Sequence, residues 1–352
     1  MKVGIITYAH CFNYGGVLQA YALQTYIKEL GHEVYIINYF DYLKGDLFPK
    51  IQGSNFVSKI KNALKFCFLF VPRLIKYFKF KAFIQDHFNV LYYKNSESID
   101  NLDILIFGSD HIWSPKLNPN RNSLVYGNLD FSRYKKVITY AISAGDFNNL
   151  DLFKKNDILL KNLSYFSAIS VREFWLKEFL SQYRTDVQIS LDPTFLLDHK
   201  WAEIFTKRKS KDFILLFNIK NDKNCTVIAK ILAKRLNKKI KAIYASTFYG
   251  KKGIYSPEQF IHLFQEAFLI ITNSFHGTAF SIINRKNFYA VKTKADEKGR
   301  IHSLLSLCHL EHRLITSVPP NPNDPVDYSD TNLKDFYELQ KDSKNFLLKN
   351  LK

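Results

Sequence analysis

Cysteine, methionine and long apolar runs are scarce in this chain of 352 residues. The sequence holds 4 Cys and 1 Met. No two cysteines show CxxC spacing, so we expect neither a zinc site nor a disulfide framework. No apolar run approaches the length of a membrane span, and the strand-like segment directly after Met1 gives no sign of a signal peptide. We therefore expect a globular protein of a reducing, cytoplasmic compartment.

Acidic residues are absent from one long segment. The formal net charge of the chain is +18. From Leu47 to Gln85 there is no Asp or Glu, and cations alternate there with aromatic residues. We expect Pro72 to divide this basic aromatic segment, residues 47–90, into two helices. The cations of the segment are Lys50, Lys59, Lys61, Lys65, Arg73, Lys76, Lys79 and Lys81.

Two interpretations of the basic aromatic segment stay open. Its composition is typical of a helix that docks on an anionic membrane surface, here as a peripheral contact at the inner face of the membrane. Alternatively, it is a helical flap whose apolar face joins the core and whose lysines are solvated. We expect no nucleic-acid partner, because no RNP, helix-turn-helix or KH motif accompanies the charge.

Short apolar runs alternate with helical patterns along the chain, which indicates an α/β fold of βαβ units with mainly parallel sheets. The length favours two domains, and a polar stretch over 192–212 separates two halves. We expect an N-terminal domain at 1–200, a C-terminal domain at 201–318, and a linker with a final helix at 319–352 that packs back on either domain. Strands are expected at 3–7, 34–38, 103–107, 137–142, 167–171, 187–191, 213–218, 240–244, 268–272 and 288–291.

The most informative segment follows the strand expected at 268–272. There the chain reads Asn-Ser-Phe-His-Gly before a helical pattern begins, so Ser274, His276 and Gly277 stand where a strand ends and a helix starts. Backbone N–H groups and the positive helix end at such a place suit a phosphate or carboxylate, and His276 is placed for proton transfer. The alternative is an ordinary capped turn in which His276 is merely hydrogen-bonded.

Two further segments follow strands in the first half of the chain. Gly15 and Gly16, together with Asn13, permit close approach of a ligand to the start of a helix, although they form no GxGxxG fingerprint; the alternative is a plain turn. The second segment, Gly108–Trp113, suits a sugar or base, and its carboxylate, Asp110, could accept a proton from a hydroxyl. Alternatively, Asp110 caps a helix and the tryptophan packs in the core. The polar and aromatic members of this second segment are Ser109, Asp110, His111 and Trp113.

Several cations could complete an anion site. Arg172 follows the strand expected at 167–171 and could clamp a phosphate or carboxylate, or it pairs with Glu173 or another acid. Arg300 lies downstream of His276. Lys292 and Lys294 also lie downstream, and we expect these two lysines to be solvated at the surface. There is no P-loop, HExxH, GxSxG or DxD motif, so nothing indicates a metal or serine hydrolase chemistry.

Taken together, these segments resemble the polysaccharide pyruvyl transferase family. The resemblance spans Lys2 to about Arg313 and rests on short motifs that occur jointly and in order. These motifs are Ile5–Thr7 with Asn13–Gln24, Phe107–Trp113, Ser170–Glu173, Asp192–Thr194, Ser256–Glu258, Thr272–Ser281, and Arg300 before Leu304-Leu305.

The resemblance implies two Rossmann-like domains facing a central cleft, similar to the GT-B glycosyltransferases. It implies phosphoenolpyruvate as donor substrate, no cofactor, and metal-independent chemistry. The acceptor would be a hydroxyl pair on a glycan or lipid-linked oligosaccharide, giving a pyruvate ketal in bacterial capsule, exopolysaccharide or cell-wall synthesis. His276 would be the proton donor and Asp110 the base. The anion would be held by Arg172, Arg300 and the helix start at Gly277.

Two positions depart from the family pattern. Many members carry Arg where this chain has Ser274, so the second donor arginine would come from elsewhere, with Arg300 as the candidate. The position after Asp110 is often Gln, and here it is His111.

Two other functions stay open: a glycosyltransferase of the same architecture that uses a nucleotide-sugar, and a non-catalytic glycan-binding or membrane-associated assembly protein.

Overall fold

The protein is described here from a computed structural model, which covers residues 1–39, 43, 47, 56–117, 124–145, 147, 150–198, 200–206, 208–244, 253–293 and 299–352. Residues 56–69, 220 and 244 are described by their backbone alone. Lys50 and Lys294 lie outside the described residues, as do the side chains of Lys59, Lys61 and Lys65.

Within the described residues, the first half of the chain forms one parallel sheet of seven strands. Its strand order is β3-β2-β1-β4-β5-β6-β7, so the order reverses between β1 and β4. The strands are β1 (Lys2–Ile6), β2 (Glu33–Asn38), β3 (Val90–Tyr92), β4 (Ile104–Asp110), β5 (Lys136–Ile142), β6 (Ala168–Val171) and β7 (Gln188–Ile189).

The second half forms a parallel sheet of five strands in the order β12-β11-β10-β8-β9, which reverses between β8 and β10. The strands are β8 (Phe213–Asn218), β9 (Lys239–Tyr244), β10 (Leu269–Thr272), β11 (Phe288–Val291) and β12 (Leu314–Ile315). The expected α/β fold with two Rossmann-like halves is confirmed. The short edge strands β3 and β12 were not predicted, because a strand of two or three residues is too short to show an alternation of apolar and polar side chains.

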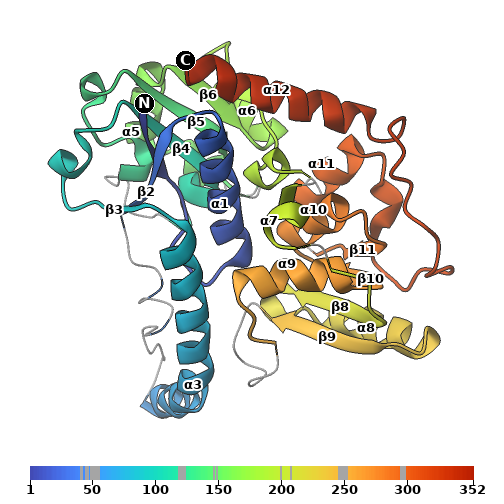
Figure 1. Cartoon of the computed structure of the whole chain (residues 1–352). Helices are drawn as coiled ribbons and strands as arrows, with labels where there is room; N and C mark the ends of the chain where they lie inside the picture. Colours follow the sequence, from blue (N-terminus) through green and yellow to red (C-terminus); the bar gives the residue numbers. More distant parts are fainter. Residues whose placement is uncertain are drawn as a thin grey trace.

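Apart from α12, which follows the last strand, the helices of the described residues lie between successive strands (Figure 1). None of those helices is long and apolar enough to cross a membrane. They are α1 (Tyr14–Glu29), α3 (Phe56–His87), α4 (Leu150–Phe153), α5 (Asp157–Asn162), α6 (Phe174–Leu180), α7 (Lys200–Ile204), α8 (Lys223–Arg235), α9 (Pro257–Glu266), α10 (Phe275–Ile283), α11 (Arg300–Leu307) and α12 (Lys334–Asn350).

Helix α1 is the structural link between the two halves. The Asn13 side chain accepts a hydrogen bond from the Gly15 N–H at its start, and Gly31, with φ +86°, follows its end, as its capping residues predict. Residues 14–24 are all buried, because α1 packs on the first sheet and also contacts α9 of the second half. The Tyr14 ring stacks on Phe260 of α9 at 4.7 Å between centroids.

Helix α3 corrects one prediction. It continues through Pro72 as a single helix from Phe56 to His87, so the proline does not divide the segment. A proline removes one backbone hydrogen bond and tends to kink a helix, and it need not end it when the flanking residues favour helix. In Figure 1 the C-terminal part of α3 approaches α1, while its other end extends away from the body of the molecule.

Helix α12 returns from the end of the chain to the first half, as Figure 1 shows in red. It contacts β5 and the 3₁₀ turn η7 (Pro193–Leu196). The Gln340 side chain donates to the Phe195 carbonyl at 2.7 Å, and the Leu191 N–H donates to Ser343 Oγ at 2.9 Å. The final helix therefore packs across the connection between the halves, one of the placements that its amphipathic pattern left open.

Candidate functional site

A cavity of about 460 Å³ lies where the two sheets face each other. Arg300 at the start of α11 contributes to its lining, and the rest comes from the ends of β1 and β4 and of β8 and β10, with the loops after them. These are the two points where the strand order reverses, and open parallel sheets bind ligands at such points. The lining residues are Tyr8, Cys11, Phe12, Asn13, Tyr14, Asp110, His111, Leu117, Phe217, Ile219, Ser274, Phe275, His276 and Arg300.

His276 lies in the first turn of α10. Ser274 caps this helix, since its hydroxyl accepts a hydrogen bond from the Gly277 N–H at 3.3 Å. The whole residue is 6% exposed. A Cβ added to Gly15 would fall 2.0 Å from His276 Nδ1, so the absence of a side chain at Gly15 makes room for the ring. The close approach expected at Gly15 is made by a side chain of the protein itself, across the two halves.

Asp192 is the anionic partner of His276, and the sequence pattern assigned it no role. Its Oδ2 lies 3.6 Å from His276 Nε2, which is longer than a hydrogen bond but within ion-pair distance when the imidazole carries a second proton. Burial alone would raise the pKa of Asp192, yet His276 and then Arg172 hold that pKa well below its usual range. The Asp-Pro-Thr motif after β7, with Thr194 N donating to Asp192 Oδ1, was the signal available in the sequence.

Arg172 is surrounded by carboxylates. Its Nη1 donates to Asp192 Oδ2 at 2.5 Å, its Nε lies 3.5 Å from Glu173 Oε1, and its Nη2 lies 3.9 Å from Asp110 Oδ1. The guanidinium is also 4.8 Å from the Phe275 ring centroid. Both interpretations of Arg172 placed it near acids or an anion, and the structure shows the pairing with acids. Arg172 does not line this cavity but lines a smaller pocket beside Phe275 and Arg300, where it holds three carboxylates together.

Glu173 has a different electrostatic environment from Asp192. Burial raises the pKa of its carboxyl, and the opposing attraction of Arg172 and Arg300 does not cancel that effect. Ser143 Oγ donates to Glu173 Oε1 at 2.5 Å. The site therefore holds one carboxyl, Asp192, that strongly favours its ionised form and a second, Glu173, that retains a proton more readily.

Arg300 begins α11 and lines the cavity. Its guanidinium carbon lies 5.6 Å from the Phe275 ring centroid, so Arg172 and Arg300 both lie against this one ring. Unlike Arg172, Arg300 reaches the cavity itself. Phe275 was not predicted as a site residue, although it immediately precedes His276.

Asp110 ends β4 with φ +60° and ψ −176°, a conformation that costs a residue with a side chain about 1–3 kcal/mol. Its Oδ1 accepts from the His111 N–H at 2.9 Å and lies 3.6 Å from His111 Nε2. The strained backbone points the carboxylate at His111 and into the cavity lining. Such strain gathers at functional sites, so the placement supports the selection of Asp110 and His111.

Other predicted site residues lie outside the cavity lining. Trp113 is fully buried, donates from Nε1 to the Val125 carbonyl at 2.9 Å and packs against Phe166, so it belongs to the core, which corrects its expected place in the site. Ser109 is likewise fully buried and donates to the Ala141 carbonyl at 3.0 Å. Lys292 is half-buried and pairs through its backbone with β12.

The two remaining glycines fit tightly. A Cβ at Gly16 would lie 3.0 Å from the Tyr8 carbonyl oxygen, and one at Gly277 would lie 2.2 Å from Thr272 Oγ1. Both glycines therefore allow a helix start to pack against the strand or loop before it.

Within the described part of the chain, no group of three or more His, Cys, Asp or Glu side chains is arranged to hold a metal ion.

The structure resembles several solved ones at low identity. A UDP-GlcNAc 2-epimerase from Neisseria meningitidis bound to UDP-GlcNAc gives a TM-score of 0.48 at 9% identity, covering 100% of this chain and 99% of that one. A UDP-GlcNAc 2-epimerase from Methanocaldococcus jannaschii gives 0.44 at 11%, covering 96% and 92%. An alpha-glucosyltransferase in complex with UDP gives 0.43 at 10%, covering 97% and 91%. These identities are too low to transfer a substrate to this chain.

The sequence itself matches one family. No curated protein matches the chain, but the family model described as polysaccharide pyruvyl transferase matches residues 13–294. That range runs from the cap of α1 past His276 and includes Asp110, Arg172 and Asp192. Because the match covers most of the chain and most of the cavity lining, this chain belongs to the polysaccharide pyruvyl transferase family, a family of transferases.

Proposed function

We propose that this chain transfers the pyruvyl group of phosphoenolpyruvate to two hydroxyls of a glycan, forming a pyruvate ketal and releasing phosphate. The observation that carries the proposal is the position of His276 at the start of α10, beside Asp192 and in a cavity that Arg300 also lines. A proton donor and a cation beside a helix N-terminus are what an anionic enol ester requires. The proposal requires no metal or cofactor.

The proposed chemistry divides between the two halves of the cavity. His276 gives a proton to the enol carbon of phosphoenolpyruvate, which leaves an oxocarbenium-like centre at the next carbon. One acceptor hydroxyl adds there and loses its proton to Asp110. The second hydroxyl then displaces phosphate, which leaves with the electron pair of the C–O bond and takes up the second hydroxyl proton. A positioned acid or base of this kind contributes about 10²–10⁴-fold.

Asp192 gains a role that the family resemblance did not give it, and the role of Arg172 changes. Asp192 positions His276, because its carboxylate Oδ2 lies 3.6 Å from Nε2. Arg300, with the α10 N-terminus, provides the charge that holds the phosphate or carboxylate. Arg172 acts through the three acids that it gathers. The aromatic wall of Phe12, Tyr14 and Phe217 would receive the apolar face of the sugar.

The test is thermal stability of the whole protein with phosphoenolpyruvate, inorganic phosphate and a panel of nucleotide-sugars. A ligand at about 100 times its Kd stabilises the native state by about 2.7 kcal/mol, and we expect a selective shift with phosphoenolpyruvate. Because an arginine–phosphate contact contributes about 1.5–3 kcal/mol, Arg300→Gln should weaken that binding by about 10–150-fold.

The matched control is Arg285→Gln, since Arg285 lies on the opposite end of α10 and donates to the Tyr337 hydroxyl. It should leave the shift unchanged. A shift with a nucleotide-sugar in place of phosphoenolpyruvate would assign glycosyl transfer to the cavity. Binding of a free glycan with no shift from any donor would assign the non-catalytic function. Either result contradicts the proposal.

We include in the proposal a lipid-linked oligosaccharide as acceptor and a cytoplasmic location at the inner face of a membrane. The feature that motivates this is the basic aromatic segment, most of which forms α3.

A further inference from the structure

The C-terminal half of α3 has an apolar outer face. Val71 and Phe78 are 52% and 57% exposed, and Leu74 and Ile75 between them are partly exposed. Residues three, four and seven positions apart lie on the same side of a helix, so these four side chains form one stripe. We call the stripe of Val71, Leu74, Ile75 and Phe78 the outer face of α3.

Positive charge borders this outer face. Lys79 and Lys81 stand on its two sides, with Lys81 Nζ 5.7 Å from the Tyr77 ring centroid and Lys79 Nζ donating to Gln259 Oε1 of α9 at 2.8 Å. The first acidic residue after this stripe is Asp86. An exposed apolar stripe with cations on its sides is complementary to an anionic lipid surface, which accepts apolar side chains and attracts lysines.

The opposite face of α3 contacts the cavity wall. Lys76, expected among the surface cations, is 2% exposed. Its Nζ lies 5.3, 5.2 and 5.4 Å from the ring centroids of Phe12, Tyr14 and Phe80. Phe12 and Tyr14 line the cavity, so one helix presents an apolar stripe outward and holds the cavity wall inward.

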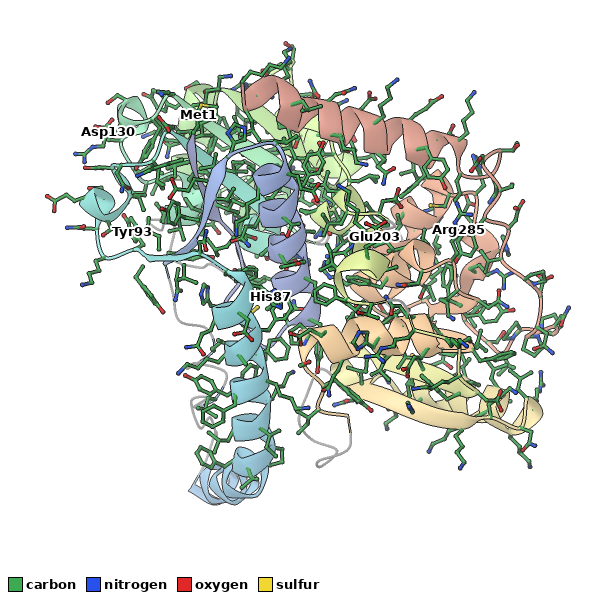
Figure 2. The ribbon with its side chains drawn as sticks, in the orientation of Figure 1. Met1, His87, Tyr93, Asp130, Glu203 and Arg285 are labelled. Carbon is green, nitrogen blue, oxygen red and sulfur yellow. The ribbon has the colours of Figure 1, made fainter. Side chains whose placement is uncertain are left out.

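The C-terminal end of α3 also meets the second half of the chain. His87 Nε2 lies 3.5 Å from Glu258 Oε1 of α9, and its ring packs against Tyr21 of α1 at 5.3 Å. Figure 2 shows His87 at this end of α3, beside α1. The C-terminal end of α3 therefore contacts α1 of the first half and α9 of the second half, the two helices that meet at Tyr14 of the cavity lining.

We propose that the outer face of α3 docks on an anionic lipid bilayer and thereby presents the cavity to an acceptor carried by that bilayer. The second part rests on the proposed function, since only a transferase needs an acceptor. Docking itself does not depend on it. Lys76 does not touch lipid; it fixes α3 to the cavity wall.

Docking can be measured by flotation of the full chain with vesicles of phosphatidylcholine alone or mixed with phosphatidylglycerol. The wild type should float with the mixed vesicles, and raising the salt concentration should weaken binding. Lys81→Gln should weaken binding about fivefold, the effect of one lysine at an anionic surface. Val71→Ser/Phe78→Ser should weaken it further, because it removes the two most exposed apolar side chains.

Helix α8 offers matched controls, because it also exposes apolar side chains beside lysines: Val227 is 51% and Ile231 38% exposed. Val227→Ser/Ile231→Ser and Lys230→Gln should bind vesicles like the wild type. The proposal is overturned if the wild type does not float with anionic vesicles at low salt, or if the α8 variants lose binding as much as the α3 variants. It is also overturned if the outer face instead holds a dimer that Val71→Ser/Phe78→Ser breaks.

The stabilisation by phosphoenolpyruvate separates the two proposals. It should be the same in Val71→Ser/Phe78→Ser as in the wild type, which also shows that the variant folds. Flotation without a phosphoenolpyruvate shift would retain the docking surface and contradict the proposed function. A phosphoenolpyruvate shift without flotation would support the proposed function and contradict the docking surface.

Discussion

The contact between Gly15 and His276 allows a substitution to be predicted in detail. Gly15 lies in the first turn of α1, and its φ is not positive. Alanine at such a helical position is ordinarily more stable than glycine by about 0.5–1 kcal/mol. Here the added Cβ would lie 2.0 Å from His276 Nδ1, well inside the 3.4–4 Å of an ordinary contact. Overpacking of this kind costs about 1–3 kcal/mol, so Gly15→Ala should destabilise the protein.

The double variant tests the cause. His276→Ala removes the ring that the new methyl group meets, so Gly15→Ala in that background should be neutral or stabilising. The coupling free energy between the two substitutions should then be about 1–3 kcal/mol. The assay is urea unfolding followed by tryptophan fluorescence and circular dichroism. The dependence of the free energy of unfolding on urea concentration, the m value, should be the same in all variants if they unfold from and to similar states.

Gly277→Ala is the contrasting variant. Its Cβ would meet Thr272 Oγ1 at 2.2 Å and Phe217 Cδ1 at 2.9 Å, so removing the imidazole of His276 should not rescue it. The reasoning is refuted if Gly15→Ala is as stable as the wild type. Equal destabilisation by Gly15→Ala with and without the His276 ring would refute it as well.

Three further predictions concern the buried charges. Asp192→Asn should lower the free energy of unfolding near neutral pH. The lowered pKa of Asp192 gives stability that is present above about pH 4 and is lost as the pH falls further. A plot of the urea midpoint against pH should therefore fall less steeply at acid pH in the variant than in the wild type. Glu173→Gln should remove the loss of stability that the wild type shows as pH rises through the raised pKa of Glu173. Arg172→Met should destabilise by about 3–5 kcal/mol, because it leaves buried carboxylates unpaired, and Asp192→Asn added to it should restore part of that loss. An Arg172→Met protein of wild-type stability would show that the arginine does not hold the cluster.

Local patterns predicted most of the strands and several helix ends. The predicted strands at 213–218 and 288–291 coincide with β8 and β11, because continuous apolar runs bounded by polar turns leave few alternatives. The cap at Ser256 and the glycine at Gly31 marked a helix start and a helix end, since capping is a contact between near neighbours. Residues placed at strand ends also met at one cavity, because parallel strands all end at the same edge.

Tertiary structure decided what each site residue does, because the partners are distant in the sequence. Arg172 pairs with Asp192 and Asp110 from separate strand ends, and no local pattern encodes such a pairing. Gly15 makes room for His276 across two domains, and Trp113 turns into the core while Asp110, three residues earlier, turns toward the cavity. The sequence by itself determined the family, the two parallel sheets and the strand ends that line the cavity. Burial and long-range charge pairing determined which of the candidate residues line that cavity and which pair with one another outside its lining.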